Sequence, residues 1–393
     1  MIGNSDKISP QLKDTLKRYW GYSEFRLSQE EIIRSVMEGR DTLALMPTGG
    51  GKSLTYQVPT LAREGLCIVI TPLIALMKDQ VDRLRQMGIA ATAIHSGMSY
   101  SQIDIALDNC VYGDMKFLYI APERLATESF RMRVQRMNVV LLAVDEAHCI
   151  SQWGYDFRPS YLRIKEVRKL LPDVPVLALT ASATQMVAED IMRQLEFEKP
   201  NIIRSSFARA NLSFAVRHTD DKNEQLLRVV NNVDGSGIIY MQSREGCEQL
   251  AEVLQQQGIS ASYYHAGLPH AERTMRQEEW TTGKVRIMVA TNAFGMGIDK
   301  SNVSFVLHYN MPLSIEAYYQ EAGRAGRDGE YACCTLLYNR ADIETAMWMI
   351  CREGDEGLSS AQIKRKYPAE YQRLEAMIDY CETEDCLREK ILS

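Results

Sequence analysis

Short apolar runs alternate with amphipathic segments through the first half of the chain. The segments at residues 73–87 and 161–171 repeat apolar positions at a spacing near 3.6, which predicts helices. The apolar runs predict buried strands, and they lie at residues 42–46, 67–71, 91–94, 117–120, 139–144 and 174–180. Strands that alternate with helices are typical of βαβ units, so we expect an α/β fold with a parallel sheet.

The second half of the chain repeats this pattern. Its apolar runs lie at residues 237–241, 261–265, 285–290, 304–308 and 333–337. Between the halves, a polar segment at residues 197–211 contains Pro200, so we place a domain boundary near Arg209. The last stretch is charged and helical in pattern. The sequence therefore predicts one α/β domain at 1–208, a second at 209–342 and a short helical element at 343–393.

A glycine-rich turn follows the first apolar run. In the sequence LALMPTGGGKS, this turn consists of Thr48, Gly49, Gly50, Gly51, Lys52 and Ser53. Backbone N–H groups at the start of a helix form an anion site, and glycines let them close around a phosphate. We expect Lys52 to reach the β- and γ-phosphates of a nucleotide and the Ser53 hydroxyl to hold Mg²⁺. The strict motif has glycine where this chain has Met46, and the competing interpretation is a flexible turn before an ordinary helix.

Upstream of this turn lie residues that suit a nucleotide base. Gln29 offers both a donor and an acceptor, so its side chain can pair with the edge of adenine. Tyr22 or Arg26 would stack on the base. The alternative for Gln29 is a surface helix position or a helix cap, which is the commoner setting for this residue type.

An acidic pair ends the fifth apolar run. Asp145 follows a buried strand in the order Asp-Glu-Ala-His and is predicted to hold Mg²⁺. Glu146 is placed to act as the general base toward an attacking water, and His148 to couple the nucleotide state to the next segment. The hydroxyls that end the sixth run, from Thr180 onward, are positioned to hydrogen-bond to this segment. The alternative is a carboxylate pair that only caps the following helix.

An aromatic segment at residues 149–161 lies directly beyond the acidic pair. It contains a glycine and a proline, which predict a loop. Trp153 and Phe157 beside Arg158 are typical of stacking on single-stranded nucleic acid, worth about 1–3 kcal/mol per base. Packing of the loop against the protein is an equally good interpretation for Phe157 and Tyr161. Trp153 is therefore the stronger candidate for contact with nucleic acid.

The second half has no further glycine-lysine turn, so we expect one nucleotide between two lobes. Asp299 follows an apolar run in a glycine-containing segment and would accept a hydrogen bond from a ribose hydroxyl. Arg324 and Arg327 lie three residues apart, the spacing that shares one helix face. We assign to this pair the stabilisation of the γ-phosphate charge during hydrolysis. The alternative is a solvated helix face.

Composition changes this picture only in part. The formal net charge of −6 gives no sign of nucleic acid, although a local groove can be basic on an acidic protein. No apolar run approaches the ~20 residues of a membrane span, and the N-terminus lacks a signal-peptide pattern. Nine cysteines without a C-x-x-C pair favour a reduced, cytoplasmic setting. Cys351, Cys381 and Cys386 do not complete a four-ligand zinc site.

Taken together, the segments MPTGGGKS, DEAHCISQWGYDFRPSY, ATNAFGMGIDK and YYQEAGRAGRDG resemble the RecQ family of superfamily 2 DNA helicases. The likeness covers nearly the whole chain, and the aromatic loop after the DEAH residues separates RecQ enzymes from the DEAD- and DEAH-box RNA helicases. It implies two tandem RecA-like lobes, ATP and Mg²⁺ in the cleft between them, and 3′-to-5′ translocation along single-stranded DNA in recombination and repair. It also implies DNA contacts at Trp153, Arg244, Ala266 and Asn292.

The resemblance departs from the family pattern at the end of the chain. Family members usually continue through a four-cysteine zinc module into a winged-helix domain, whereas here Cys386 resembles the first ligand and its partners would lie beyond Ser393. We therefore expect a truncated core or a short member: a monomer that hydrolyses ATP on single-stranded and forked DNA, unwinds weakly and lacks a complete zinc site. The alternatives are an RNA-directed helicase and a DNA-binding module without useful turnover.

Overall fold

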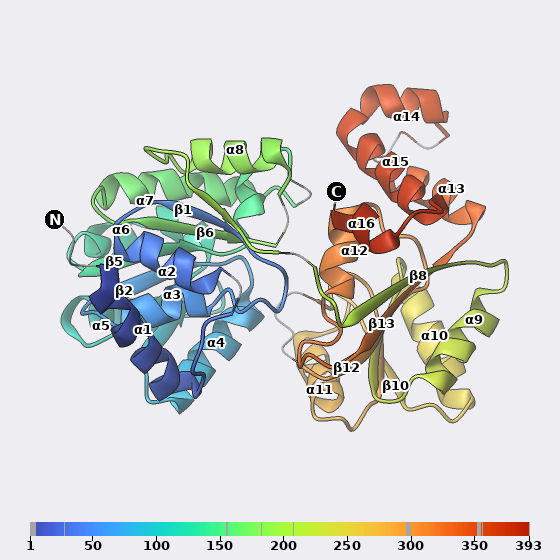
Figure 1. Cartoon of the computed structure of the whole chain (residues 1–393), viewed down its shortest axis with the longest axis horizontal. Helices are drawn as coiled ribbons and strands as arrows, with labels where there is room; N and C mark the ends of the chain where they lie inside the picture. Colours follow the sequence, from blue (N-terminus) through green and yellow to red (C-terminus); the bar gives the residue numbers. More distant parts are fainter. Residues whose placement is uncertain are drawn as a thin grey trace. The chain divides into compact units, whose positions relative to one another are not determined.

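The computed structural model describes residues 5–26, 28–154, 156–181, 183–206, 208–295, 300–351, 355 and 357–392. The chain divides into two compact units, Met1–Phe207 and Ala208–Ser393 (Figure 1). Each unit is a parallel sheet with helices on both faces, which confirms the α/β fold expected from the alternating pattern. Among these residues, every helix is too short or too polar to span a bilayer.

The strands of the first unit are short and mostly buried. In the described part of this unit they form a seven-stranded parallel sheet in the order β3-β4-β2-β5-β6-β1-β7. Their bounds are β1 (Thr42–Leu45), β2 (Leu66–Ile70), β3 (Ala91–Ile94), β4 (Phe117–Ile120), β5 (Val139–Val144), β6 (Val176–Thr180) and β7 (Ile202–Arg204). Helices cover a parallel sheet on both faces, which is why its inner strands read as continuous apolar runs.

Helices pack on the two faces of this sheet. They are α1 (Ser5–Trp20), α2 (Gln29–Met37), α3 (Leu54–Leu61), α4 (Ile74–Gln86), α5 (Tyr100–Tyr112), α6 (Glu128–Val134), α7 (Ile164–Leu170) and α8 (Gln185–Gln194), with the 3-10 helices η1 (Pro122–Ala126), η2 (Ala147–Ile150) and η3 (Pro159–Arg163). On one face, α2, α3 and α4 pack with strand residues such as Cys67 and Val69. On the other, α5 to α8 pack with Ile68 and Ile70, because successive strand side chains point to opposite faces.

The second unit repeats the architecture. Its described residues form six parallel strands in the order β10-β11-β9-β12-β13-β8. Their bounds are β8 (Leu212–His218), β9 (Ser236–Tyr240), β10 (Ala261–Tyr264), β11 (Ile287–Ala290), β12 (Val303–His308) and β13 (Ala332–Tyr338). Its helices are α9 (Lys222–Asn232), α10 (Arg244–Gln256), α11 (His270–Thr281), α12 (Ile315–Ala322), α13 (Arg340–Ile350), α14 (Ser360–Lys366), α15 (Pro368–Glu382) and α16 (Leu387–Leu392).

The C-terminal helices belong to the core of the second unit. Residues 343–393 are largely helical, as the sequence predicts. Leu374, Met377 and Tyr380 of α15 pack in the same buried cluster as Tyr318 of α12. On the opposite face of the sheet, α9 and α10 form a separate cluster with the strands. The last helices therefore pack on α12 and α13, extend the buried cluster on one face of this sheet, and do not form a core of their own.

Two strands, β7 and β8, are missing from the predicted set. Each lies at the edge of its sheet, and each is partly exposed. An edge strand is paired on one side only, so it does not need a continuous apolar run. β7 lies within the polar segment in which the domain boundary was expected and β8 directly follows it, and their mixed composition explains why they were overlooked.

The strand order of the first sheet decides where its functional side chains gather. β5, β6 and β1 are neighbours and parallel, so their carboxyl ends meet at one edge. The glycine-rich turn follows β1, the acidic pair follows β5, and the hydroxyl-rich segment begins at the end of β6. The carboxyl ends of parallel strands are where α/β sheets bind ligands.

Candidate functional site

The glycine-rich turn joins β1 to α3 and has backbone conformations that favour glycine. Gly49 and Gly51 have φ values of 79° and 74°, in the left-handed region. A Cβ atom on Gly51 would lie 2.4 Å from the side-chain nitrogen of Gln29. One on Gly50 would lie 3.0 Å from the Pro47 carbonyl oxygen. The turn is therefore closed to larger side chains.

The start of α3 presents backbone donors without a partner in the protein. Among the described residues, the N–H groups that donate no hydrogen bond to another protein group include those of Gly49, Gly51, Lys52 and Ser53. Ser53 is the N-cap residue, and its side chain makes no capping hydrogen bond. Unpaired N–H groups at a helix N-terminus carry partial positive charge and bind anions. The turn therefore fits a phosphate group.

The acidic pair at the end of β5 lies beside the lysine of this turn. The Lys52 ammonium is 4.0 Å from Oε1 of Glu146. Desolvation by the surrounding protein, and then the charge of Glu146, raise the pKa of Asp145 to about 6 in spite of the Lys52 charge. Two adjacent carboxylates beside one lysine leave negative charge that a hard cation such as Mg²⁺ can offset. The donor set therefore fits the magnesium ion that the sequence predicts.

Glu146 has a backbone conformation that is uncommon for a residue other than glycine. Its φ of 48° and ψ of 47° lie in the left-handed region. The Oε2 atom of its carboxylate lies 3.4 Å from Nδ1 of His148. The same ring nitrogen is 2.9 Å from Oγ1 of Thr180, so the expected bond between the two segments is present. Strained backbone of this kind concentrates at functional sites, and here it fixes the predicted general base at the sheet edge.

The residues predicted to bind adenine form a connected group. The Gln29 amide nitrogen lies 3.0 Å from the carbonyl oxygen of Gly50 and 3.2 Å from that of Gly51, and it donates to both. Its side-chain oxygen accepts from the Arg26 N–H at 2.9 Å, and the Arg26 guanidinium lies 5.6 Å from the centre of the Tyr22 ring. Gln29 begins α2 but is buried, which excludes a surface position. In this conformation its hydrogen bonds support the turn, and adenine recognition stays a prediction.

Residues of the aromatic loop divide between the core and the surface. Tyr161 is fully buried, and its hydroxyl donates to the Asp145 carbonyl oxygen at 2.9 Å. This tyrosine therefore packs the loop down. Trp153 is 52% exposed, and Phe157 is half-buried. Of the loop's described aromatic residues, Trp153 has the most surface to offer a nucleobase.

Asp156 is a functional candidate that the sequence interpretation left out. It accepts hydrogen bonds from Nε and Nη2 of Arg158, at 3.1 and 2.9 Å. It also lies 3.7 Å from the sulfur of Cys149. The sequence did contain a signal for Asp156: it lies two residues before Arg158 and carries the opposite charge. Within a loop, side chains at this sequence separation can form a charge-assisted hydrogen bond. Arg158 is therefore held in place by this carboxylate.

In the second unit, the residues predicted to contact DNA lie at one edge of the sheet. Arg244 follows β9, Ala266 follows β10 and Asn292 follows β11, and these strands are parallel neighbours. All three residues are exposed. The Arg244 guanidinium lies against the turn after β10, since a Cβ atom on Gly267 would be 3.1 Å from its Nη1. The second unit therefore brings these predicted contacts together.

The arginine pair does not lie on a helix. α12 ends at Ala322, and Arg324 and Arg327 belong to the turns that follow it. The expectation of a shared helix face is therefore wrong, because glycines interrupt the helix and Gly326 has a φ of 56°. Arg324 is buried and donates to the carbonyl of Gly295 in its own unit, whereas Arg327 is half-buried.

Two further predicted site residues receive no support from geometry. Asp299 lies outside the described residues, so its contact with a ribose stays a prediction. Cys386 is exposed, and no group of three metal-ligating side chains in the described part of the chain includes it. All nine cysteines are free thiols.

Family comparisons match both units. Residues 26–191 match the family described as DEAD/DEAH box helicase, and residues 221–329 match the helicase conserved C-terminal domain. These two matches, with the phosphate-type turn and the acidic pair, define a helicase core of the DEAD/DEAH class.

Curated relatives narrow this class to one family. The ATP-dependent DNA helicase RecQ of Bacillus subtilis is 45% identical over 380 residues, covering 96% of this chain and 63% of the relative. The ATP-dependent DNA helicase RecQ of Haemophilus influenzae is 42% identical over 385 residues, covering 98% of this chain and 61% of the relative. Over nearly its whole length this chain is therefore similar to bacterial RecQ helicases. It spans less than two thirds of the length of these relatives.

Solved structures share the fold at low sequence identity. The helicase Lhr of Mycobacterium smegmatis, bound to single-stranded DNA and AMP-PNP, has a TM-score of 0.68 and 18% identity over 94% of this chain and 57% of that chain. Dbp5 of S. cerevisiae, bound to RNA and ADP BeF3, has a TM-score of 0.67 and 18% identity over 99% of both chains. These likenesses show the tandem RecA-like fold and nothing about the substrate.

Proposed function

We propose that this chain is an ATP-dependent DNA helicase of RecQ type, which moves 3′ to 5′ along single-stranded DNA and acts in recombination and repair. The unpaired N–H groups at the start of α3 carry this proposal, because they lie next to Lys52 and the lysine lies 4.0 Å from Glu146. A phosphate site beside a carboxylate that can accept a proton suits hydrolysis of a nucleoside triphosphate. Similarity to relatives that are named ATP-dependent DNA helicase RecQ directs the proposed activity toward DNA.

Each group at this sheet edge has a part in the proposed hydrolysis. The N–H groups of the turn and the Lys52 ammonium hold the negative charge of the β- and γ-phosphates. Ser53 and Asp145 would hold Mg²⁺, which neutralises charge on the phosphate oxygens when bound. Glu146 orients the attacking water and accepts its proton. In the second unit, Arg327 has more exposed surface than Arg324, so we propose it as the arginine that contacts the γ-phosphate.

The proposed DNA contacts come from both units. Trp153 offers an exposed aromatic face, and stacking contributes about 1–3 kcal/mol per base. Arg244 lies among exposed residues at the ends of β9, β10 and β11, where a guanidinium can contact phosphate. The aromatic loop is linked to the nucleotide site because the Tyr161 hydroxyl donates to the Asp145 carbonyl. DNA bound at Trp153 can therefore influence the acidic pair through this loop.

ATP hydrolysis with and without single-stranded DNA tests the proposal. We expect DNA to stimulate the wild type, Lys52→Ala to lower the rate by about 10²–10³-fold, and Trp153→Ala to lose most of the stimulation. Lys165→Ala is the matched control, because it removes an exposed lysine of α7 in the same unit. A rate that ignores DNA, or that RNA stimulates more strongly, would show that this chain is not a DNA-directed motor.

We further propose single-stranded and forked DNA as substrates, a monomeric state and a cytoplasmic location. Unwinding of a labelled fork and the mass of the protein in solution, measured on the same preparation, test the first two. Weak unwinding with strong ATP hydrolysis is the expected result, and efficient unwinding by this chain alone would contradict it.

A further inference from the structure

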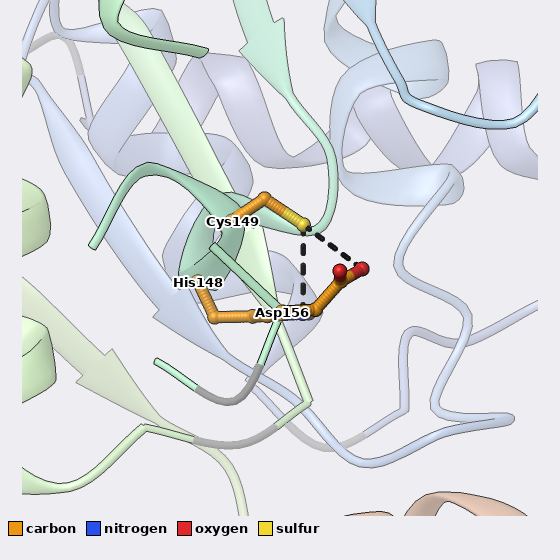
Figure 2. Close-up of side chains that lie close together, drawn as sticks. All are labelled: His148, Cys149 and Asp156. Atoms are coloured by element: carbon orange, nitrogen blue, oxygen red, sulfur yellow. Dashed lines mark hydrogen bonds between the residues drawn. The ribbon is translucent and has the colours of Figure 1, made fainter. Parts of the chain in front are cut away.

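A histidine, a cysteine and an aspartate that follow the acidic pair in the sequence converge in the structure (Figure 2). His148 and Cys149 lie in η2, and Asp156 lies in the aromatic loop. The Cys149 sulfur is 3.7 Å from Nε2 of His148 and 3.7 Å from Oδ2 of Asp156. All three ligand atoms lie within 4.8 Å of one another. A tetrahedral zinc ion holds its ligand atoms about 3.3–3.6 Å apart, so small side-chain movements would bring these atoms to that geometry.

The histidine of this cluster is already arranged as a metal ligand. Burial lowers the pKa of His148, so its imidazole is neutral near pH 7. Its Nδ1 faces Oγ1 of Thr180 at 2.9 Å and the Glu146 carboxylate at 3.4 Å, which leaves Nε2 on the side of the sulfur. Metal-binding histidines are usually oriented in this way by a partner on the other ring nitrogen.

Two groups oppose binding of a cation at this cluster. Arg158 donates two hydrogen bonds to Asp156, and burial raises the pKa of the Cys149 thiol well above its usual range. A bound divalent cation would form bonds to one nitrogen, one sulfur and one oxygen, release the thiol proton to solvent and separate Arg158 from Asp156. These costs predict a weaker affinity than that of a structural zinc site. They also make the arginine a direct competitor of the ion.

We propose that His148, Cys149 and Asp156 form a binding site for a zinc-type divalent cation, which competes with Arg158 for Asp156. Imidazole nitrogen, thiolate sulfur and carboxylate oxygen are the donors that Zn²⁺ takes in proteins, whereas Mg²⁺ takes oxygen ligands. The cluster is therefore chemically distinct from the magnesium site proposed at Ser53 and Asp145. The existence of this site does not depend on the proposed helicase activity.

Metal binding in the absence of nucleotide and DNA tests the site directly. The protein, treated with a chelator and then dialysed, is titrated with Zn²⁺ against a chromogenic indicator and, separately, with Co²⁺ while thiolate-to-cobalt absorption is recorded. A Cys386→Ser background removes the exposed thiol that would otherwise compete for metal. We expect one ion per chain and an absorption band typical of a cobalt–thiolate bond.

Four substitutions in this background separate the cluster from adventitious binding. Cys149→Ser and Asp156→Asn each remove a ligand and should weaken Zn²⁺ binding by at least about 100-fold, because second-shell partners alone contribute about 10–100-fold. Cys110→Ser, at a buried thiol on α5 of the same unit, should leave binding unchanged. Arg158→Ala removes the competitor and should strengthen binding, which no unrelated surface site would do.

The outcomes decide the question even where one variant is unstable. Circular dichroism identifies a variant that has not folded, and the remaining ligand variant together with Arg158→Ala then carries the test. Loss of the cobalt–thiolate band in Cys149→Ser, with tighter Zn²⁺ binding in Arg158→Ala, supports the site. Equal metal uptake by Cys149→Ser and its background, or no uptake by the background protein, overturns it.

Discussion

The two units build the same kind of parallel sheet but differ in the turn that leads from an inner strand to the next helix. In the first unit, β1 leads to α3, and the Ser53 side chain makes no capping bond to the open N–H groups of the turn. In the second, β9 leads to α10, and the Ser243 hydroxyl accepts a hydrogen bond from the Gly246 N–H at 3.0 Å. Where a side chain at the start of a helix accepts a hydrogen bond from a backbone N–H group, one N–H group fewer is open to a ligand. A few turn residues, rather than the sheet, therefore decide which of these two helix starts offers open N–H groups to a phosphate.

Histidine–carboxylate pairs extend this comparison. In the first unit, Glu146 lies 3.4 Å from His148 and within reach of Lys52 in the phosphate turn. In the second, Nε2 of His265 lies 2.8 Å from Glu248, on a helix whose start is already capped. The same two side-chain types thus occur beside an open helix start in one unit and beside a closed one in the other.

Glu146→Gln has the largest expected effect. Glutamine keeps the size of the side chain but accepts no proton, so kcat for ATP hydrolysis should fall by about 10²–10⁴-fold while nucleotide still binds. Glu248→Gln makes the same chemical change in the second unit and should alter kcat far less. Steady-state ATP hydrolysis and binding of a fluorescent nucleotide measure the two effects. Similar losses of kcat in both variants would remove the distinction between the units.

Gly51→Ala tests the shape of the turn against a matched glycine. Gly51 and Gly39 have φ values of 74° and 77°, so alanine costs about 1–2 kcal/mol at either position. Around Gly39 a Cβ atom meets nothing within 4 Å, whereas at Gly51 it would lie 2.4 Å from the Gln29 side chain. Displacing Gln29 breaks its hydrogen bonds to the turn, each worth about 0.5–1.5 kcal/mol.

We therefore expect Gly51→Ala to lose more free energy of unfolding than Gly39→Ala. We also expect a loss of nucleotide affinity of about tenfold, since 1.4 kcal/mol is a factor of ten. Urea unfolding and equilibrium nucleotide binding check both quantities. If the two variants lose the same stability and the same affinity, the close approach of Gln29 to the turn has no role in holding it.

Much of the fold could be predicted because its inner strands are covered on both faces. β2 is buried at every position and β5 at every position except Val140, so an apolar run marks each of them. β7 and β8 carry no such mark, because β7 has only three residues and β8 is partly exposed over most of its length, whereas the other two edge strands, β3 and β10, do coincide with apolar runs. The information that identifies β7 and β8 lies in their partner strands, which are distant in sequence.

The candidate site was predictable where chemistry depends on local spacing. The turn around Lys52 and the pair at Glu146 follow directly from their motifs, and parallel neighbouring strands bring them together. The helix face expected for Arg324 and Arg327 was wrong, because a spacing of three residues places side chains on one face only inside a helix, and α12 ends before Arg324. Their role toward the γ-phosphate stays a prediction. The contact of Asp156 with Cys149 depends on how the aromatic loop closes, which no local pattern specifies.

The smallest expected effects come from replacing, one at a time, the serine at the start of α10 and the serine at the start of α3 with alanine. Ser243→Ala removes a capping bond and should lower the free energy of unfolding by about 1 kcal/mol. Ser53→Ala has no capping bond to lose, so its effect should stay within about 0.5 kcal/mol, while the affinity for Mg²⁺-nucleotide falls. Urea unfolding gives the first comparison, and nucleotide binding at varied Mg²⁺ concentration gives the second.

Amide hydrogen exchange then locates the loss of stability. In Ser243→Ala the first turn of α10 should exchange faster while that of α3 is unchanged, because the lost bond belongs to the Gly246 N–H. In Ser53→Ala neither helix should exchange faster without nucleotide, and added nucleotide should protect α3 less than it does in the wild type. Faster exchange of α3 in nucleotide-free Ser53→Ala would mean that this serine stabilises its helix as an ordinary cap. The contrast between an open and a closed helix start would then no longer explain why one unit takes the phosphate.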